Sequence, residues 1–250
     1  MNKKIKIALL GYGKMGHEIE KLALEKGHEI VIKLDHMNMD SFDWDELTKA
    51  DVAIEFTQPE AAVDNIIKCF NADVPVVCGT TGWLSRYEEV ENICRKENRG
   101  FFYASNYSLG VNLFFELNRK LAEMMRPYNQ FDLKVTEIHH TQKLDSPSGT
   151  AISIAQDLLK KTGNRKEWVN QLVAAPSDIK KVEKDQLLIV SLREEGVPGT
   201  HTVEYTSDVD SIEITHTAFS RKGFAAGALM AAEWMSGKKG VYSMKDLLNL

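Results

Sequence analysis

Cysteine is scarce in this sequence, and its pattern bears on the kind of protein the chain forms. The three residues, Cys69, Cys78 and Cys94, form no CxxC pair and are odd in number. That pattern fits buried thiols in a reducing compartment better than a disulfide framework. No apolar run reaches membrane-spanning length, and the short run after the first lysines ends in a glycine loop without a signal-peptide cleavage site. We therefore expect a cytoplasmic protein with no membrane partner.

Basic residues are too few for a surface that binds polyanions. Over 250 residues, 36 Asp and Glu oppose 31 Lys and Arg, for a formal net charge of -5. Nucleic-acid binding usually needs a net basic face, so we expect no nucleic-acid partner and favour small molecules or other subunits. Internal repeats, low-complexity tracts and flexible linkers are also missing, which indicates closely packed domains.

The first hundred residues alternate short β-rich runs with helical patterns. The expected strands span residues 5–10, 29–34, 52–56, 74–78 and 101–104. The expected helices span residues 15–26, 60–70 and 86–97. This alternation is typical of βαβ units, so it predicts an α/β fold with an N-terminal, Rossmann-type, doubly wound parallel sheet.

From about Ser108 the pattern changes to that of a second, α+β domain. Its expected elements are a helix over 113–125, a strand over 131–138, a helix from about Pro147, and strands over 187–192, 200–206 and 211–217. Turn residues separate the last three strands, so meander-like antiparallel pairing is the simplest arrangement. The stretch 160–184 is polar and poorly periodic. An Ala-rich amphipathic helix over 224–235 could return to cover the first domain.

A glycine motif marks a dinucleotide site near the N-terminus. The segment IKIALLGYGKMGHEIEKLALEKG predicts strand, tight turn and helix around a complete GxGxxG. Gly11 permits the turn, Gly13 lets the backbone approach a pyrophosphate, and Gly16 lets the helix pack on the strand. The pyrophosphate would lie on free N–H groups at the helix start. The alternative is that these glycines only cap a βα turn.

Asp35 supports the dinucleotide site and bears on the choice of cofactor. It ends the next strand, 24 positions after Gly11, where a carboxylate can bind the adenosine ribose hydroxyls. A carboxylate there repels a 2′-phosphate, although His36 and Lys33 could partly offset it. We expect NADH as the preferred cofactor and keep NADPH as the alternative; a solvated strand end is the other explanation of Asp35.

Small and polar residues follow the fourth and fifth expected strands. They occupy positions 79–81 and 104–108, in the runs VCGTTGW and ASNYS. Open α/β sheets bind ligands at the carboxyl ends of their strands, so these runs are candidates for nicotinamide-ribose contacts. An ordinary Gly-Thr turn explains the first run equally well.

A cluster of proton-transfer residues follows the strand expected at 131–138. His139, His140 and Lys143 lie in the stretch EIHHTQKLDSPSGTA. Histidine titrates near neutrality, and lysine can fix a carboxylate or donate a proton. The histidines could instead ligate zinc, or be ordinary surface or core residues. Neighbouring strand residues point to opposite faces and no carboxylate or cysteine stands at ligand spacing, so we expect no metal.

An anion site is expected at the helix that comes next. The helix should open at Ser146 or Pro147, with Asp145 or Ser146 as its cap. Its free N–H groups would be those of Ser148, Gly149 and Thr150. Arg221 and Lys222, before the last helix, could present a second cation to a dicarboxylate, or could be solvated charges.

Taken together, these motifs resemble the 4-hydroxy-tetrahydrodipicolinate reductase (dihydrodipicolinate reductase) family of bacterial lysine and diaminopimelate synthesis. The matching stretches run in order over nearly the whole chain: GYGKMG, EFTQPE, CGTTGW, SNYSLGVN, EIHHTQKLDSPSGTA, REEGVPGTHTVEY and HTAFSRKGFAAGAL. The HHxxKxDxPSGTA element is the most specific of them.

The resemblance implies a dinucleotide-binding domain over residues 1–107, completed by 219–250, and a substrate-binding domain over 108–218 whose sheets assemble a homotetramer. It implies that His139 is the proton donor or acceptor and Lys143 the proton donor. With the residues above, the expected substrate contacts are His140, Ser148, Gly149, Thr150 and Arg221. The expected cofactor contacts are Gly11, Tyr12, Gly13, Lys14, Met15, Gly16, Asp35, Gly79, Thr80, Thr81, Ala104, Ser105, Asn106 and Tyr107.

The implied reaction is loss of the 4-hydroxyl from a cyclic imine dicarboxylate, hydride delivery to C4 and protonation of the adjacent carbon. Two departures from the family matter: the glycine loop is one residue shorter than its common form, and His36 stands where an arginine often accompanies dual cofactor use. An aspartate dehydrogenase-like enzyme is one alternative, but it should lack the spacing from Lys143 to PSGT. An NADH-sensing protein without turnover is another, against which His139 and Lys143 argue.

Overall fold

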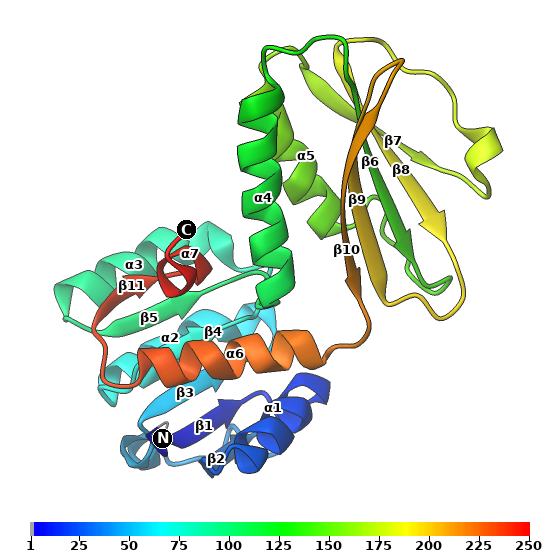
Figure 1. Ribbon diagram of the computed structural model, residues 1–250. Coiled ribbons are helices and arrows are strands. Elements are labelled where there is room, and N and C mark those ends of the chain that lie inside the picture. The colour runs from blue at the N-terminus through cyan, green and yellow to red at the C-terminus, as the bar shows by residue number, and fades with distance from the viewer. Residues whose placement is uncertain (1–2) are drawn as a thin grey trace. The chain divides into compact units, whose positions relative to one another are not determined.

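The computed structural model describes residues 3–250, which divide into two compact units (Figure 1). Unit 1 comprises residues 3–109 together with Lys222–Leu250, and unit 2 is Gly110–Arg221. The sequence places these boundaries after residues 107 and 218. Each unit has its own sheet and its own buried core.

Unit 1 is built on a six-stranded parallel sheet. Its strands are β1 (Lys6–Leu10), β2 (Glu29–Leu34), β3 (Val52–Glu55), β4 (Val76–Cys78), β5 (Gly100–Tyr103) and β11 (Gly240–Tyr242). They lie in the order β11-β5-β4-β3-β1-β2, so the order reverses between β1 and β3. The inner strands are buried along nearly their whole length, because helices cover both faces of the sheet.

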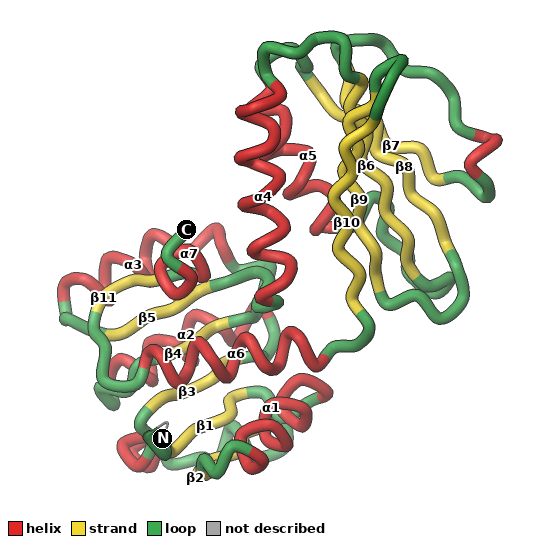
Figure 2. Tube along the Cα trace, viewed as in Figure 1, coloured by secondary structure: helices red, strands yellow, loops and turns green. Residues whose placement is uncertain are grey.

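The helices of unit 1 form a layer on each face of this sheet (Figure 2). They are α1 (Lys14–Glu25), α2 (Pro59–Asn71), α3 (Tyr87–Lys96), α6 (Lys222–Met235) and α7 (Met244–Leu248). Helices α1 and α6 pack on one face, and α2 and α3 pack on the other. Small residues let α6 approach closely: a Cβ built on Gly227 would lie 1.8 Å from the carbonyl oxygen of Tyr107.

Unit 2 packs two helices against a mixed five-stranded sheet. Its elements are α4 (Leu109–Met125), β6 (Asp132–His139), α5 (Gly149–Thr162), β7 (Glu167–Leu172), β8 (Gln186–Arg193), β9 (Gly199–Thr206) and β10 (Ser211–Ala218). The strand order is β10-β9-β6-β8-β7. Helices α4 and α5 cover one face, where Phe114 and Ile154 pack on Val135 and Ile189.

The predicted α/β fold, with a parallel sheet and a second sheet, is confirmed, but two predictions about unit 2 are wrong. Strand β7 was missed within 160–184, because it is an edge strand without a clean alternation of buried residues. The predicted antiparallel pairing of consecutive strands is found only between β9 and β10, since β8 pairs in parallel with β6. Neighbouring strands in a sequence favour hairpins, whereas the crossover through α5 permits parallel pairing.

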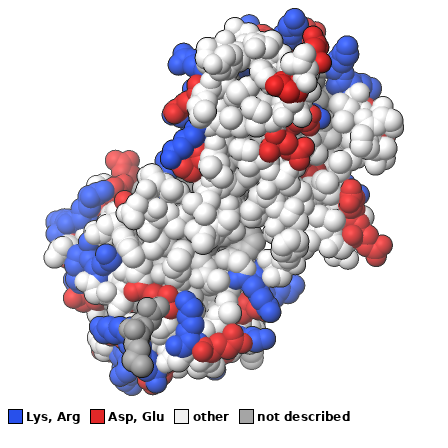
Figure 3. Space-filling view, in the orientation of Figure 1, with Lys and Arg blue, Asp and Glu red and all other residues white. Residues whose placement is uncertain are grey.

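Within residues 3–250, no helix combines the length and apolarity needed to span a bilayer. On the face shown in Figure 3, Lys and Arg intermingle with Asp and Glu on each unit. No large field of positive charge is visible on that face.

The close approach of α6 predicts that Gly227→Ala destabilises unit 1 by about 3 kcal/mol, because a methyl group would force the helix away from Tyr107. Gly223→Ala is the matched control in the same helix, because its Cβ would meet only Ser108 Oγ, at 3.8 Å. We expect it to change stability by at most about 1 kcal/mol. Urea unfolding followed by tryptophan fluorescence measures both, and equal stability of the two variants would contradict the packing argument.

Candidate active site

Unit 1 holds a cleft of about 480 Å³ at the carboxyl ends of its inner strands. Its lining residues come from the loops after β1, β3 and β4 and from the first turns of α1 and α2: Gly13, Lys14, Met15, Gly16, Phe56, Thr57, Gln58, Pro59, Gly79, Thr80 and Thr81. The cleft therefore lies where the strand order reverses, which is where open α/β sheets bind ligands. Seven predicted cofactor residues line it, at positions 13–16 and 79–81. Residues 56–59 lie in the family-matching stretch EFTQPE but are not among the predicted cofactor contacts.

The three glycines of the motif meet different surroundings. Gly11 has a φ of +96°, and a Cβ there would lie 2.0 Å from the carbonyl oxygen of Phe56. At Gly16 a Cβ would lie 2.6 Å from the Gly11 oxygen, so both positions need glycine for packing. Among the described residues, 3–250, none fills the space beside Gly13 and no side chain caps the N-terminus of α1. Free N–H groups beside open space fit the pyrophosphate of a dinucleotide.

A buried glutamate joins the loops after β3 and β4. Glu55 is fully buried at the end of β3. Its carboxylate accepts hydrogen bonds from the Thr57 N–H and the Cys78 thiol, each at 3.0 Å. Burial raises the pKa of Cys78 well above its usual value, so this thiol stays protonated and can donate. The Thr57 N–H also donates to Thr80 Oγ1 at 2.8 Å, which ties the two loops together.

Asp35 follows β2, and its carboxylate accepts the Met37 N–H at 2.8 Å. His36 beside it is exposed. Lys33, which could offset the charge of Asp35, is paired instead with Glu20 at 3.2 Å. The hydroxyl of Tyr12 also donates to Glu20.

The run after β5 is organised by its own contacts. Tyr107 is buried, and its hydroxyl donates to the Cys78 carbonyl at 2.7 Å, so its side chain supports the sheet rather than lining the cleft. Asn106 Oδ1 accepts the Ser108 N–H at 2.9 Å. Ala104 is buried and Ser105 is exposed.

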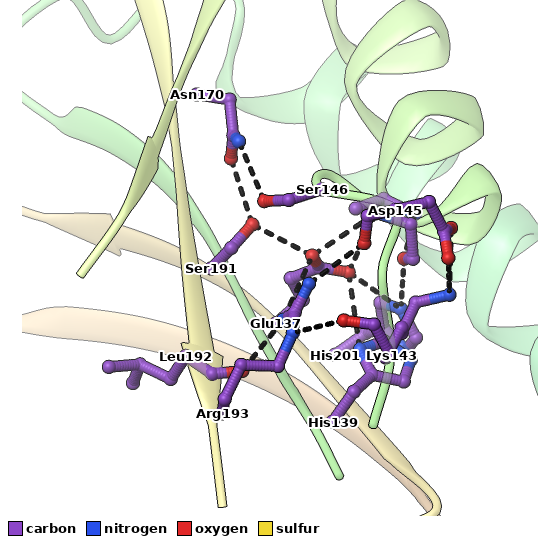
Figure 4. Close-up of polar contacts among 12 residues, drawn as sticks. Glu137, His139, Lys143, Asp145, Ser146, Asn170, Ser191, Leu192, Arg193 and His201 are labelled. Carbon is purple, nitrogen blue, oxygen red and sulfur yellow. Dashed lines mark hydrogen bonds and ion pairs between the residues drawn. The ribbon is translucent and has the colours of Figure 1, made fainter. Parts of the chain in front are cut away.

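In unit 2, β6 places His139, the predicted proton donor or acceptor, in a cluster of polar groups (Figure 4). His139 is the last residue of β6 and is 7 % exposed, whereas His140 is half-buried. Glu137 precedes His139 by two residues and therefore lies on the same face of the strand. Lys143 follows in the loop and pairs with Asp145 at 2.7 Å.

Glu137 is the centre of this cluster. It is fully buried and accepts the Ser148 N–H at 3.0 and 3.1 Å with its two oxygens. The Ser191 hydroxyl donates to it at 2.7 Å. A guanidinium nitrogen of Arg193 and Nε2 of His201 each lie 3.8 Å away. Of these four partners, only Ser148 is among the site residues predicted from the sequence.

The start of α5 differs from its prediction. The helix begins at Gly149 and is capped by Ser148, whose Oγ accepts the Ala151 N–H at 3.1 Å. The predicted start at Ser146 or Pro147 and cap at Asp145 or Ser146 are wrong, because Glu137 holds the Ser148 N–H outside the helix. The anion site therefore retains the N–H groups of Gly149 and Thr150, which lie in the first turn.

Arg193 contacts this cluster, whereas the predicted cation Arg221 does not. Arg193, at the end of β8, donates to the carbonyl oxygens of Asp145 at 2.8 Å and Lys143 at 3.3 Å, and so holds the lysine loop. Arg221 is exposed in the turn after β10. Within residues 3–250, no hydrogen bond or ion pair joins its side chain to this cluster.

Burial governs the protonation of both histidines in the cluster. It lowers the pKa of His139, while the Glu137 carboxylate opposes this by favouring the charged ring. It lowers the pKa of His201 to about 4, so that ring stays neutral at physiological pH. The His201 Nε2 lies 3.1 Å from Ser148 Oγ, within hydrogen-bond distance.

Glu137, His139 and His201 also have the chemistry of a metal site, with ligand atoms within 4.8 Å of one another. The expectation that no carboxylate lies near the histidines is wrong, because β6 places Glu137 beside His139. Both Glu137 oxygens already accept hydrogen bonds, and Arg193 adds positive charge. These contacts fit a hydrogen-bonded carboxylate better than a metal ligand.

Comparison with known proteins covers both units. Residues 5–107 match the family model described as dihydrodipicolinate reductase, N-terminus, and residues 110–248 match its C-terminus counterpart. The chain belongs to the dihydrodipicolinate reductase family. The predicted resemblance is therefore confirmed, and the N-terminal domain implies a pyridine nucleotide cofactor.

Individual relatives agree with this family. A curated 4-hydroxy-tetrahydrodipicolinate reductase of Christiangramia forsetii is 50 % identical over 97 % of each chain. One from Methanoregula boonei is 36 % identical over 81 % of this chain and 76 % of its own. A solved dipicolinate-bound dihydrodipicolinate reductase from Paenisporosarcina sp. TG-14 has a TM-score of 0.76 at 23 % identity, covering 98 % of this chain and 99 % of its own. That likeness shows a shared fold.

The buried His201 predicts a pH-dependent loss of stability. Its pKa is about 4 in the folded protein against 6.5 for an ordinary histidine, so the unfolded chain takes up the extra proton first as the pH falls. The free energy of unfolding should therefore decrease between pH 6.5 and 4, by up to about 3 kcal/mol from this residue. His201→Gln removes that contribution. Urea unfolding at several pH values compares the variant with the wild type, and parallel curves would contradict the prediction.

Proposed function

We propose that this chain is a pyridine-nucleotide-dependent 4-hydroxy-tetrahydrodipicolinate reductase of lysine and diaminopimelate synthesis. The observation that carries the proposal is that one carboxylate, Glu137, contacts both the buried His139 and the residue that caps α5, within a chain whose residues 5–107 and 110–248 match the family. Family membership also argues against an aspartate dehydrogenase-like enzyme. A proton-transfer histidine in a built cluster argues against a protein that only senses NADH.

The anion site at α5 supports a carboxylate-bearing substrate. The N–H groups of Gly149 and Thr150 start a helix of 14 residues, whose dipole favours negative charge at this end. Open space beside Gly149 leaves room for a ligand. Lys143 and His140 are proposed as further contacts to the substrate carboxylates, with Ser148 holding the loop and Arg221 as a second cation. The Paenisporosarcina enzyme binds dipicolinate, a cyclic dicarboxylate of the same class.

His139 is proposed as the proton donor or acceptor of the reaction, and Lys143 as a proton donor. The reduced nicotinamide, when bound, supplies a hydride for C4 of the substrate ring. The adjacent carbon then needs a proton, which His139 is proposed to supply. Burial lowers the pKa of His139, and the Glu137 carboxylate opposes this by favouring the charged ring. Lys143 is held by Asp145 through a charged hydrogen bond, and its ammonium can serve as a donor or fix a carboxylate.

The cleft of unit 1 is proposed to hold the cofactor, with NADH preferred over NADPH. Its glycine loop leaves free N–H groups for the pyrophosphate. Asp35 would meet the adenosine ribose, and Lys33 is engaged by Glu20 rather than free to attract a 2′-phosphate. Contacts from positions 104–107 also remain proposals, as does the homotetramer implied by the resemblance.

A coupled assay tests the proposed activity and the role of His139. Pyruvate and aspartate semialdehyde are condensed by a synthase, this protein is added, and NADH and NADPH oxidation are followed separately. We expect oxidation with the wild type and a loss of roughly two to four orders of magnitude in kcat for His139→Gln, because the proton donor is removed. Binding of NADH should be unchanged in the variant. No oxidation of either cofactor by the wild type would refute the proposed activity.

The choice of cofactor depends on Asp35. We expect Asp35→Ser to raise the ratio of kcat/KM for NADPH to that for NADH by about tenfold, which corresponds to about 1.4 kcal/mol of removed repulsion. Asp40→Ser is the matched control, because Asp40 is an exposed acid in the same loop. If both variants kept the wild-type ratio, the proposal that Asp35 binds the adenosine ribose and disfavours NADPH would be refuted.

A further inference from the structure

A fully buried carboxylate stands where the pattern of β6 calls for an apolar residue. The strand turns Leu133, Val135, Glu137 and His139 toward the interior, and the first two pack in the core. Burying an ionised carboxylate costs free energy unless donors replace its water. Glu137 has such donors in the Ser148 N–H and the Ser191 hydroxyl, which replace the water that burial removes. Hydrophobic packing does not require it.

Glu137 faces the inner edge of the His139 ring. Its Oε2 lies 3.4 Å from His139 Nδ1. That nitrogen is buried and has no hydrogen-bond partner within residues 3–250, while the side chain as a whole keeps 9 % exposure. The exposed part of the side chain therefore lies away from Nδ1. On the other side of the ring, a Cβ built on Gly199 would lie 3.0 Å from His139 Nε2. The His201 ring packs edge-on against the His139 ring, with 5.1 Å between the ring centroids. The ring is thus held from several sides.

The same carboxylate also fixes the anion site. It accepts the N–H of Ser148, and Ser148 is the residue whose hydroxyl caps α5. A displacement of Glu137 would therefore move the His139 edge and the start of the helix together. One group thus sets the distance between the proton donor and the N–H groups of Gly149 and Thr150.

We propose that Glu137 is a positioning residue of this site, which fixes the Nδ1 edge of His139 and ties the N-terminus of α5 to it. The inference rests on the proposed function, because it assigns Glu137 a part in that reaction. The charged or titratable groups that face His139 are Glu137 on the same strand, Lys143 and Asp145 in the loop, Arg193 on β8 and His201 on β9. Glu137 supplies most of the negative charge, so its loss should make the imidazolium harder to form.

Glu137→Gln tests this role, with Glu213→Gln as the matched control because Glu213 is an exposed glutamate on β10 of the same unit. We expect kcat to fall roughly 10- to 100-fold in Glu137→Gln, as when the carboxylate partner of an oriented imidazole is removed. The high-pH limb of the kcat/KM profile should also move to lower pH, because His139 loses its proton more easily. NADH binding should be unchanged, and the control should match the wild type throughout.

A merely structural role would lower activity without moving the pH limb, and that result would overturn the proposal. A wild type with no reductase activity would instead refute the proposed function itself. If Glu137→Gln does not fold, nitrogen-15 NMR of the wild type can show which ring nitrogen of His139 carries the proton. The His139 signal is assigned by its loss in His139→Gln. We expect the neutral ring to carry its proton on Nδ1, facing Glu137. A proton on Nε2 would overturn the inference.

Discussion

A carboxyl group can be buried at low cost only if hydrogen-bond partners replace the water it has lost, and this constraint shapes both units of the chain. Glu55 and Glu137 are each fully buried near the end of an inner strand. Their donors come from the loops that follow, through the N–H groups of Thr57 and Ser148. Those loops lead into the cleft of unit 1 and into the start of α5 in unit 2, which are the proposed cofactor and anion sites. The hydrogen bonds that satisfy the buried carboxyl groups therefore also shape both proposed sites.

Both units also offer a helix N-terminus to an anion. In unit 1 the first turn of α1 follows Gly13, beside which there is open space. In unit 2 the first turn of α5 follows Ser148, and the space beside Gly149 is open as well. Glycine at these positions keeps backbone N–H groups accessible, whereas Gly11 serves close packing. A dinucleotide pyrophosphate and a substrate carboxylate can thus be bound by the same physical means.

The sequence predicts the parts of this structure that depend on local patterns. The inner strands of unit 1 are short apolar runs between helical patterns, and GxGxxG lies in one continuous segment, as do His139, Lys143 and the start of α5. Strand β7 was missed, because an edge strand buries too little to show a period of two. The short β11 was missed because three residues carry no pattern.

Most of the cluster around Glu137 could not be predicted from the sequence, because its residues are distant along the chain and come together only through the order of the strands in the sheet. Ser191 and His201 lie more than fifty positions along the chain and reach Glu137 only because β8 and β9 flank β6. The meander arrangement would have placed β8 beside β9 and separated these residues. One signal was available, since an acidic residue interrupts the apolar face of β6 at Glu137. A buried acid two positions before a histidine could have been noted as its partner.

Isotope labelling distinguishes the proposed sources of the two hydrogens, the cofactor for the hydride at C4 and the solvent for the proton at the adjacent carbon. The reaction is run once in ordinary water with NADH deuterated at the transferable position, and once in heavy water with unlabelled NADH, and the product is examined by NMR. We expect the cofactor label only at C4 and the solvent label at the adjacent carbon. Cofactor deuterium at any other carbon, or a product that takes no deuterium from the cofactor, would contradict it.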